Sequence, residues 1–209
     1  MSLFPIFLKL AGRKCLVVGA GEIAESKIHS LLSAEAQVVV VAPEAKAELA
    51  SLAEEGRFAW QRREFVEADL DGVFLVVAAT DLPEVNAAVY REAAKQDVLC
   101  NAVDDPPNCD FYFPSIVRRD KLQVAISTSG ESPALAQQLR REIEEQLPQD
   151  LGPWLDALGE LRREVLAVLP PGESRKLLLH ELAQRSVCQS DACPSRQFAR
   201  DKEAILRHQ

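Results

Sequence analysis

A pair of glycines near the N-terminus is the first feature whose spacing could support chemistry. Residues 19–24 read GAGEIA, between an apolar run and a segment with helical periodicity. Gly19 allows a tight turn, and Gly21 lets the backbone approach a pyrophosphate. The N–H groups of Glu22 and Ile23 then belong to a helix N-terminus, which attracts anions. The turn predicts dinucleotide binding; the alternative is a turn of the same shape that binds nothing.

The end of the second apolar run should lie beside the ribose of such a dinucleotide. An acidic residue is expected there to hold the ribose hydroxyls, and the sequence reads VAPE at residues 41–44. Pro43 and Glu44 are therefore candidate cofactor-binding residues, and Glu44 can accept the hydroxyls if the backbone bends. Because no arginine stands here to hold a 2′-phosphate, NAD is favoured over NADP.

The fourth apolar run ends in AATD, residues 78–81. Residues that follow this strand lie beside the nicotinamide in doubly wound dehydrogenases, which makes Thr80 and Asp81 candidates for that wall of the site. A second interpretation, compatible with the first, is that Asp81 caps the helix expected over 83–96.

Alternating apolar strands and amphipathic helices must position these residues. The apolar runs are continuous, as expected for strands covered on both faces, and the connections between them are short. The pattern predicts an α/β fold with a doubly wound parallel Rossmann sheet. The expected strands are 15–19, 37–42, 57–62, 73–79 and 97–103, and the expected helices are 22–34, 44–55 and 83–96.

The alternation stops after residue 103. The segment DDPPNCDFYFPS is rich in turn residues, and SIVRRDKLQVAIS reads as a hairpin that turns at Arg119-Asp120. A helix follows, with Ser132 as N-cap, Pro133 at its first position, and an apolar face formed by Ala134, Leu135, Leu139, Ile143 and Leu147. The tail from Asp150 is helical and divided at PPG, residues 170–172.

We expect three parts: a Rossmann domain at 1–112, a small hairpin-plus-helix dimerisation and active-site region at 113–148, and a helical C-terminal domain at 149–209. The middle part has little core of its own and would gain stability from a second copy of the chain, so a homodimer is expected.

Composition excludes several classes of function. The net charge of −8 argues against nucleic acid as a partner. The apolar runs are too short to cross a bilayer, and residues 1–14 lack the features of a signal peptide, so we expect a cytoplasmic protein without a membrane partner. Five scattered cysteines do not form a disulfide framework. Cys188 and Cys193 lie near His180, but their spacing is not that of a recurrent zinc site, and no metal ligands are assigned.

Six segments occur in an order that resembles the siroheme synthase N-terminal family, over roughly residues 3–165. They are FPIF, VVGAGEIAESK, AATD, CNAVDDP, FYFPSIVRRDKLQVAISTSGESPALA and the helix 139–148. Members of this family are NAD-dependent precorrin-2 dehydrogenases and sirohydrochlorin ferrochelatases. Since the chain stops where the fused methyltransferase of longer members would begin, it looks like the stand-alone form.

The resemblance implies that NAD+ accepts a hydride from precorrin-2, a tetrapyrrole with eight carboxylates, to give sirohydrochlorin. It implies Asp104, in the N-x-V-D segment, as the catalytic residue, and some members also insert Fe2+. Asp104 follows the fifth strand at the sheet edge that carries the other candidates, and a carboxylate there can accept a proton.

A polycarboxylate substrate needs cations that work against the global charge. Arginine binds carboxylates through two parallel hydrogen bonds, and hydroxyl groups can add further bonds. Thr128 departs from the family, which often has serine there. The candidate substrate-binding residues are Arg118, Arg119, Lys121, Ser127, Thr128, Ser129 and Arg140, with Arg141 beside them; ordinary solvated side chains are the alternative for each.

Two other functions compete with this one. A non-enzymatic NAD-sensing regulatory domain would explain the glycine turn and the dimer without using Asp104. A dehydrogenase of some small acid would need a histidine or lysine as acid–base group after the sheet, and none stands in an obvious place. The segments NAVD, FPSI and SGESPALA favour the dehydrogenation of precorrin-2 over both alternatives.

Overall fold

The computed structural model describes residues 3–206, and the side chains of residues 3–201. The chain divides into two compact units, Met1–Phe113 and Pro114–Gln209. Among the described residues, no helix combines the length and the apolar character needed to cross a membrane.

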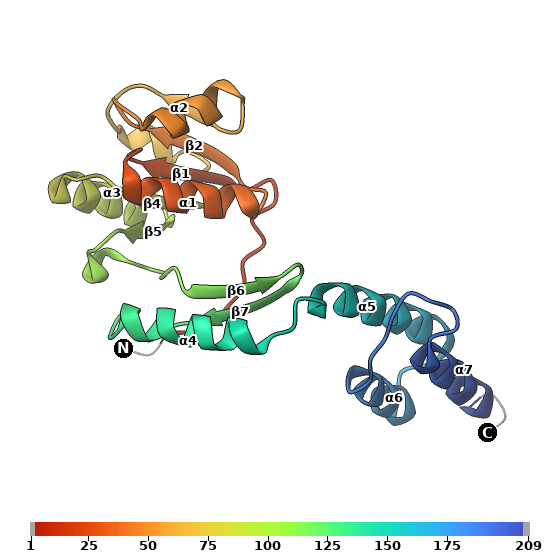
Figure 1. The fold of residues 1–209 in the computed structure, drawn as a ribbon. Coiled ribbons are helices and arrows are strands. Elements are labelled where there is room, and N and C mark those ends of the chain that lie inside the picture. The colour runs from red at the N-terminus through yellow and green to blue at the C-terminus, as the bar shows by residue number, and fades with distance from the viewer. Residues whose placement is uncertain (1–2, 207–209) are drawn as a thin grey trace. The chain divides into compact units, whose positions relative to one another are not determined.

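The first unit is built on a five-stranded parallel sheet (Figure 1). The strands are β1 (Lys14–Val18), β2 (Gln37–Val41), β3 (Ala59–Gln61), β4 (Leu75–Ala78) and β5 (Leu99–Ala102). Their order is β3-β2-β1-β4-β5, so the chain reverses its direction of winding between β1 and β4. In open parallel sheets, ligands bind at the carboxyl edge beside such a switch point.

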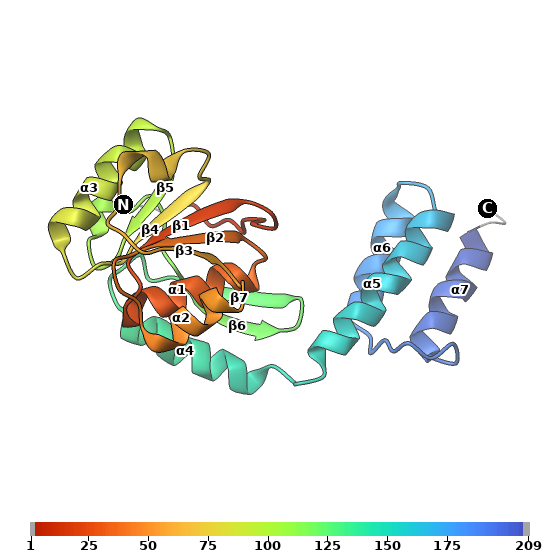
Figure 2. The same cartoon turned by 90° about the horizontal axis from the view of Figure 1, so that it is seen from above.

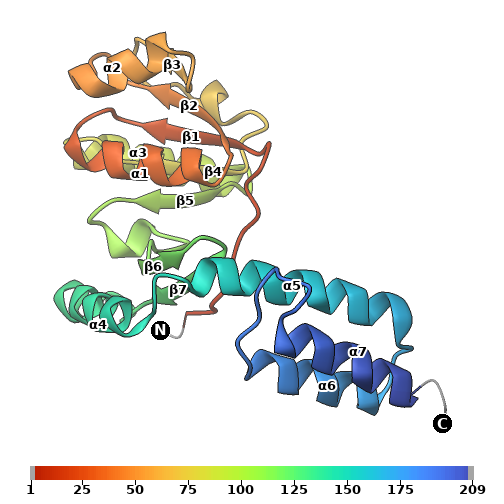
Figure 3. The same ribbon diagram turned by 45° about the vertical axis from the view of Figure 1, so that its right-hand side comes forward.

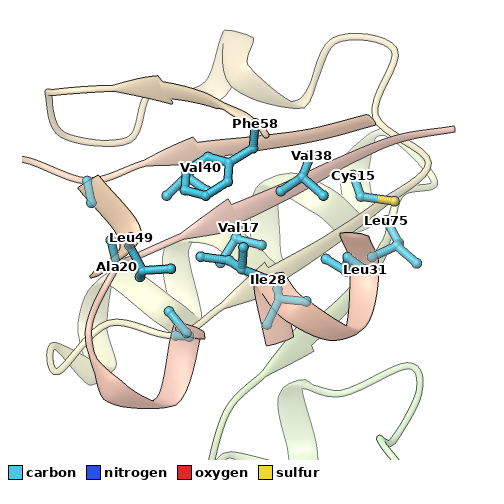
Figure 4. Close-up of a cluster of buried hydrophobic side chains, with 14 of the residues drawn as sticks. Cys15, Val17, Ala20, Ile28, Leu31, Val38, Val40, Leu49, Phe58 and Leu75 are labelled. Atoms are coloured by element: carbon cyan, nitrogen blue, oxygen red, sulfur yellow. The ribbon is translucent and has the colours of Figure 1, made fainter. Parts of the chain in front are cut away.

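Helices cover both faces of this sheet. Figure 2 shows α1 (Glu22–Ser33) and α2 (Ala47–Glu54) on one face and α3 (Pro83–Lys95) on the other. Successive side chains of a strand point to opposite faces. Cys15 and Val17 therefore enter the cluster beneath α1 and α2, which Figure 4 shows, whereas Leu16 and Val18 enter the cluster beneath α3.

The predicted fold class is confirmed, although several elements are shorter than expected. β3 spans three residues instead of the predicted 57–62, because only Ala59–Gln61 pair with β2. α2 begins at Ala47, three residues after the predicted start, because the backbone bends at Pro43-Glu44 after the second strand. Short 3-10 turns follow β3 and β5, at Glu67–Leu70 and Pro106–Asn108.

The second unit starts with the predicted hairpin. β6 (Ser115–Arg119) and β7 (Leu122–Ile126) pair antiparallel, and α4 (Pro133–Gln146) packs along them. Ser132 caps α4 as predicted, since its hydroxyl accepts a hydrogen bond from the Leu135 N–H at 3.2 Å.

The predicted apolar face of α4 is wrong at its N-terminal end. Ala134 is exposed and Leu135 is 45% exposed, whereas Ala136 is buried. The face that packs is therefore rotated by one to two residues from the face that the apolar side chains alone suggest.

Three helices complete the second unit: α5 (Leu151–Val168), α6 (Glu173–Ala183) and α7 (Pro194–Leu206), which lie side by side in Figure 3. The segment PPG separates α5 from α6, as predicted. Small and aliphatic side chains form the shared core: Ala157, Leu161, Val165, Leu169, Leu178, Leu182, Val187, Cys193 and Ala199.

Candidate active site

The glycine turn lies at the switch point of the sheet. Gly19 has φ 104°, and its N–H donates to the Val41 carbonyl at 2.9 Å. A Cβ on Gly19 would lie 2.4 Å from the backbone oxygen of Ala79, the residue that follows β4. Only glycine fits here, because both the conformation and the close approach of the two strand ends exclude a side chain.

Gly21 has a different role, which is to keep the space beside the turn open. A Cβ at this position would meet nothing within 4 Å, and Gly21 caps α1 without a side-chain hydrogen bond. Glu22 and Ile23, the first residues of α1, are both exposed. The N–H groups of this turn therefore face open space, which a pyrophosphate could fill. The residues present fit a dinucleotide.

Lys46 supports this turn, although no sequence pattern pointed to this residue. Its ammonium lies 2.5 Å from the Glu25 carboxylate and 3.7 Å from that of Glu22, and its backbone N–H donates to the Ala20 carbonyl at 3.1 Å. The hydrogen bond from Lys46 lowers the pKa of Glu25. Lys46 thus compensates two negative charges that would otherwise oppose an anion at the start of α1.

At the end of β2 the bend required of the backbone is present, at Pro43-Glu44. Both residues are exposed, and Glu44 makes no ion pair with any residue that the structure describes. Its carboxylate is available to accept hydrogen bonds from a ribose, and its role as a cofactor-binding residue stays a prediction.

At the end of β4 the interpretation of Asp81 as a helix cap is wrong. The N-cap of α3 is Leu82, which has no side-chain cap, and Asp81 is exposed. Asn86, buried in α3, holds this loop instead: its Oδ1 accepts from the Thr80 N–H at 3.1 Å and from the Thr80 hydroxyl at 2.8 Å. The amide of Asn86 also donates to the Thr80 carbonyl at 3.0 Å. Thr80 is therefore a fixed part of the sheet edge.

Asp104 stands at a sharp corner after β5. The chain remains bound to β4 up to Val103, whose N–H donates to the Ala78 carbonyl at 2.9 Å, and Asp104 then adopts φ 60°. This left-handed conformation is uncommon for residues other than glycine and is tolerated best by asparagine and aspartate. The side chain of Asp104 is exposed, whereas the neighbouring Asp105 accepts a hydrogen bond from Asn108 at 2.6 Å.

The segment that follows Asp104 returns along β5 and fixes this corner. Asp110 exchanges two hydrogen bonds with the backbone of Cys100, at 2.8 and 2.9 Å. The buried Asn101 amide donates to the Phe111 carbonyl at 2.8 Å. The corner that carries Asp104 is therefore held on one side by the bond from Val103 to β4, and on the other by the bonds from the following segment to β5.

Lys27 is a second basic residue that the sequence reasoning missed. It lies half-buried on α1, with its ammonium 4.3 Å from the centre of the Phe113 ring. Burial lowers the pKa of Lys27, and the negative charge of Asp104 raises it in part. A signal was present in the sequence, because Lys27 occupies the apolar stripe of α1 between the buried Ala24 and Leu31.

The predicted substrate-binding residues on the hairpin differ in what they contact. Arg119 is buried; its guanidinium donates to the Glu144 carbonyl oxygen at 2.7 Å and to the Glu144 carboxylate at 3.3 Å. Arg118, on the opposite face of β6, is exposed and makes no ion pair with any described residue. Arg119 thus stabilises the unit, and its charge is already engaged by Glu144.

Lys121 and Arg140 have partners within this unit, whereas Arg141 is exposed and makes no ion pair with any described residue. Lys121 pairs with Asp156 at 2.6 Å, and Arg140 pairs with Glu144 at 2.5 Å across one helical turn. Both pairs are partly exposed, so each has modest strength and a carboxylate ligand could compete for the cation.

The hydroxyl-rich segment Ser127, Thr128 and Ser129 forms the turn before α4. The hydroxyls of Ser127 and Thr128 accept bonds from the N–H groups of Ser129 and Ser132, each at 3.1 Å. Ser129 has φ 54°, and its side chain is exposed. The O–H group of each of these two hydroxyls can still donate a hydrogen bond to a carboxylate.

Among the residues whose side chains are described, no group of three or more His, Cys, Asp or Glu is arranged to hold a metal ion. His180 is exposed on α6.

An open parallel sheet with a glycine turn at its switch point defines a Rossmann-type dinucleotide-binding protein. In agreement, the sequence model of a family described as putative NAD(P)-binding matches residues 6–115, and that of the sirohaem biosynthesis protein central domain matches residues 119–146. The chain belongs to the siroheme synthase N-terminal family, as the resemblance indicated. NAD, the predicted cofactor, is supported by this family match and by the structural neighbour described next.

Two curated relatives illustrate the family. Siroheme synthase 3 of Aeromonas hydrophila is 43% identical over 204 residues, which are 95% of this chain and 44% of that protein. Siroheme synthase 1 of Serratia proteamaculans is 45% identical over 79% of this chain and 35% of its own length. The chain therefore spans less than half the length of these relatives. The first match extends beyond residues 3–165, the range to which the resemblance was assigned.

A solved structure is similar over its whole length. SirC, precorrin-2 dehydrogenase, has a TM-score of 0.73 and 28% sequence identity, and the alignment covers 99% of this chain and 98% of SirC.

Proposed function

We propose that this chain oxidises precorrin-2 to sirohydrochlorin with NAD+. One observation carries the proposal: Asp104, on a fixed left-handed corner, lies at the same sheet edge as the glycine turn, in a chain that aligns end to end with a precorrin-2 dehydrogenase. The carboxyl ends of β1, β4 and β5 meet at this edge, so a cofactor on the turn would lie near Asp104.

The chain's residues would divide the work of binding as follows. The N–H groups of the turn at Gly21–Ile23 would hold the pyrophosphate, and Glu44 would accept the ribose hydroxyls. Thr80, fixed by Asn86, and Asp81 would line the nicotinamide end. Bound NAD+ would supply a hydride acceptor.

Asp104 would accept the proton that the substrate loses together with the hydride. The exposed carboxylate can reach a bound ligand, and its position is fixed by the bonds on both sides of the corner. Lys27 would hold the carboxylate by attraction from the α1 side, since each charge favours the other. A base positioned in this way contributes roughly 10²–10⁴-fold to the rate.

The second unit would bind the substrate's carboxylates. Arg118 is the first candidate, because it is the exposed arginine of the hairpin and is free of ion pairs with described residues. Lys121, Arg140 and the hydroxyls of Ser127, Thr128 and Ser129 would add weaker contacts.

We also propose that a second copy of the chain covers the outer face of the hairpin. Ile116 and Ala125 are cross-strand neighbours on the face opposite α4, and both are exposed. Leu135 on α4 is also 45% exposed. Multi-angle light scattering should give twice the chain mass, and Ile116→Glu should shift the protein toward the monomer, whereas Gln137→Glu on exposed α4 surface should not. A monomeric wild type at all concentrations would exclude the dimer.

The cytoplasmic location stays a prediction.

The test of the activity is an anaerobic turnover assay with enzymatically made precorrin-2 and NAD+, in which NADH formation and the sirohydrochlorin spectrum are followed. Asp104→Asn should bind NAD+ as the wild type does and lose at least about a hundredfold in turnover. Asp105→Asn is the matched control, because its carboxylate contacts Asn108.

If the wild type binds NAD+ without turnover, the chain acts as an NAD-sensing domain instead. If Asp105→Asn loses as much activity as Asp104→Asn, Asp104 has no special role. Fe2+ insertion, which the resemblance also implies, is tested by adding Fe2+ to the sirohydrochlorin formed and following the siroheme spectrum.

A further inference from the structure

Two cysteines meet where α7 begins. Cys193 directly precedes the helix, and its carbonyl accepts the hydrogen bond of the Gln197 N–H at 3.0 Å. The Cys188 N–H donates to the sulfur of Cys193 at 3.4 Å, so the two residues are in direct contact. Cys193 is 3% exposed, whereas Cys188 is exposed. A buried sulfur thus contacts the backbone of a cysteine that solvent reaches.

The surroundings of Cys193 favour its thiolate. Burial alone would raise the pKa of Cys193. The N–H groups of Cys188, Arg196 and Ser195, together with the Cys188 thiol, outweigh this effect and lower the pKa to about 7. Burial raises the pKa of Cys15 to about 11 and that of Cys100 to about 12. Near neutral pH, Cys193 is therefore ionised to a far greater extent than these two core cysteines.

A polar network fixes the loop 184–193 that brings the cysteines together. The buried Arg196 donates to the Cys188 carbonyl at 2.7 Å and forms ion pairs with Glu160 and Glu164 of α5, at 2.9 and 3.1 Å. The Ser195 hydroxyl donates to the Ser186 carbonyl at 2.6 Å. The contact between the two cysteines is therefore part of an ordered framework.

The pair is also accessible. An open pocket of about 400 Å³ is lined by Arg185, Ser186, Cys188, Cys193, Pro194 and Ser195. A small oxidant can enter it, and the side chain of Arg185 adds a positive charge at its rim.

We propose that Cys188 and Cys193 form a redox-active dithiol that a hydroperoxide oxidises to an intrachain disulfide. The Cys193 thiolate attacks the peroxide oxygen; an S–O bond forms, the O–O bond breaks, and an alcohol or water leaves after protonation. The Cys188 thiol then attacks the resulting sulfenic sulfur, an S–S bond forms, and water leaves. In sum, two thiols and one hydroperoxide give one disulfide, one alcohol or water, and a further water. A dithiol reductant reverses the change by exchange.

This site is independent of the proposed dehydrogenase. Neither cysteine belongs to the proposed cofactor or substrate sites, and the redox step uses neither NAD+ nor the tetrapyrrole.

The first experiment measures alkylation of the full chain by iodoacetamide against pH, with each cysteine-containing peptide quantified by mass spectrometry. The rate at Cys193 should rise with a midpoint near pH 7, whereas Cys109 should stay unreactive, since burial raises its pKa. At neutral pH, Cys193 should hold about tenfold more thiolate than an ordinary exposed cysteine. If Cys193 reacts no faster than Cys109, the proposal is overturned.

The second experiment treats the chain with hydrogen peroxide, blocks free thiols and maps the peptides. The wild type should lose two hydrogens in a Cys188–Cys193 linked peptide, and dithiothreitol should restore both thiols. Cys188→Ser should instead leave a sulfenic acid at Cys193 that dimedone traps, and Cys193→Ser should leave neither product. Serine is a favourable N-cap, so this variant should fold, which circular dichroism checks.

Cys109→Ser is the matched control and should form the disulfide as the wild type does. If only disulfides between chains form, or if Cys188→Ser gives no trapped sulfenic acid, the pair is not a redox dithiol.

Discussion

The two glycines of the turn should fail in different ways when each is replaced by alanine. In Gly19→Ala the new Cβ would lie 2.4 Å from the Ala79 carbonyl oxygen, in a backbone conformation with φ 104°. The left-handed conformation costs about 1–2 kcal/mol and the forced packing about 1–3 kcal/mol, so we expect a loss of about 2–5 kcal/mol in unfolding free energy. That loss does not depend on NAD+.

Gly21→Ala should instead weaken only the binding of the cofactor. Its φ of −85° and ψ of −166° are open to alanine, and the Cβ would meet nothing within 4 Å. The poorer cap and the stiffer unfolded chain act in opposite directions, so the unfolding free energy should change by less than about 1 kcal/mol. The methyl group would occupy the space where we place the pyrophosphate. A clash of about 1.4 kcal/mol there weakens binding about tenfold.

Urea denaturation with and without NAD+ separates the two effects. At an NAD+ concentration of about 100 times the wild-type Kd, bound cofactor stabilises the wild type by about 2.7 kcal/mol, and the same concentration stabilises Gly21→Ala by only about 1.4 kcal/mol. If the cofactor-free Gly21→Ala is as unstable as Gly19→Ala, the steric reasoning is wrong. If Gly21→Ala gains the full 2.7 kcal/mol, the pyrophosphate does not bind over this turn.

Three further predictions concern charged groups. In Asp104→Asn, burial still lowers the pKa of Lys27 but the charge that raised it is gone, so the Lys27 pKa should fall further; an unchanged carbon NMR titration of the methylated lysine would show that the groups are not coupled. Arg63 holds the pKa of the half-buried Asp69 below its ordinary value, although burial raises it. This pair therefore stabilises the fold at pH values above the ordinary pKa of aspartate, and the contribution is lost as pH falls through the lowered pKa. Asp69→Asn should therefore cost about 1–2 kcal/mol at neutral pH, and urea midpoints of variant and wild type should converge in acid; a constant gap would contradict this. Lys46→Met should lower NAD+ affinity several-fold, with the loss greatest at low salt, and calorimetry that finds no loss would contradict the role of Lys46 at the glycine turn.

The sheet could be predicted because its strands are buried on both faces. The runs around Leu16, Val40 and Val76 are continuously apolar, and segments with helical periodicity separate the strands. This alternation specifies a parallel sheet and its carboxyl edge. Prediction was weakest at the edge strand β3, where pairing with a single neighbour, and not hydropathy, determines the length.

The core of the C-terminal helices could not be predicted from the number of apolar residues. Cys193 and Ala199 are small and lie among charged neighbours, yet both are buried between α5, α6 and α7. Arg196, a charged residue, is also buried there because two glutamates of α5 pair with it. Helical periodicity identifies such helices, but the faces they bury depend on ion pairs that no window of sequence contains.

At the site, the residue types were predictable and their partners were not. The NAVD segment placed Asp104 after β5, but its left-handed corner depends on Asp110 and Phe111, which are hydrogen-bonded to that strand. Lys27 faces Phe113, which is 86 residues away in sequence, so only the folded chain brings the two together.

The hairpin arginines show how far local pattern could have gone. Side chains alternate across a strand, so Arg119 shares a face with Val117, and Arg118 points away from both. Val117 is apolar and buried against α4, which places Arg119 inward and requires a buried partner for its charge. Glu144 supplies that partner, from a position 25 residues later. The alternation alone therefore distinguishes the exposed arginine, which we propose binds a substrate carboxylate, from the buried one that holds the hairpin to its helix. The identity of the buried partner depends on how α4 is rotated about its axis.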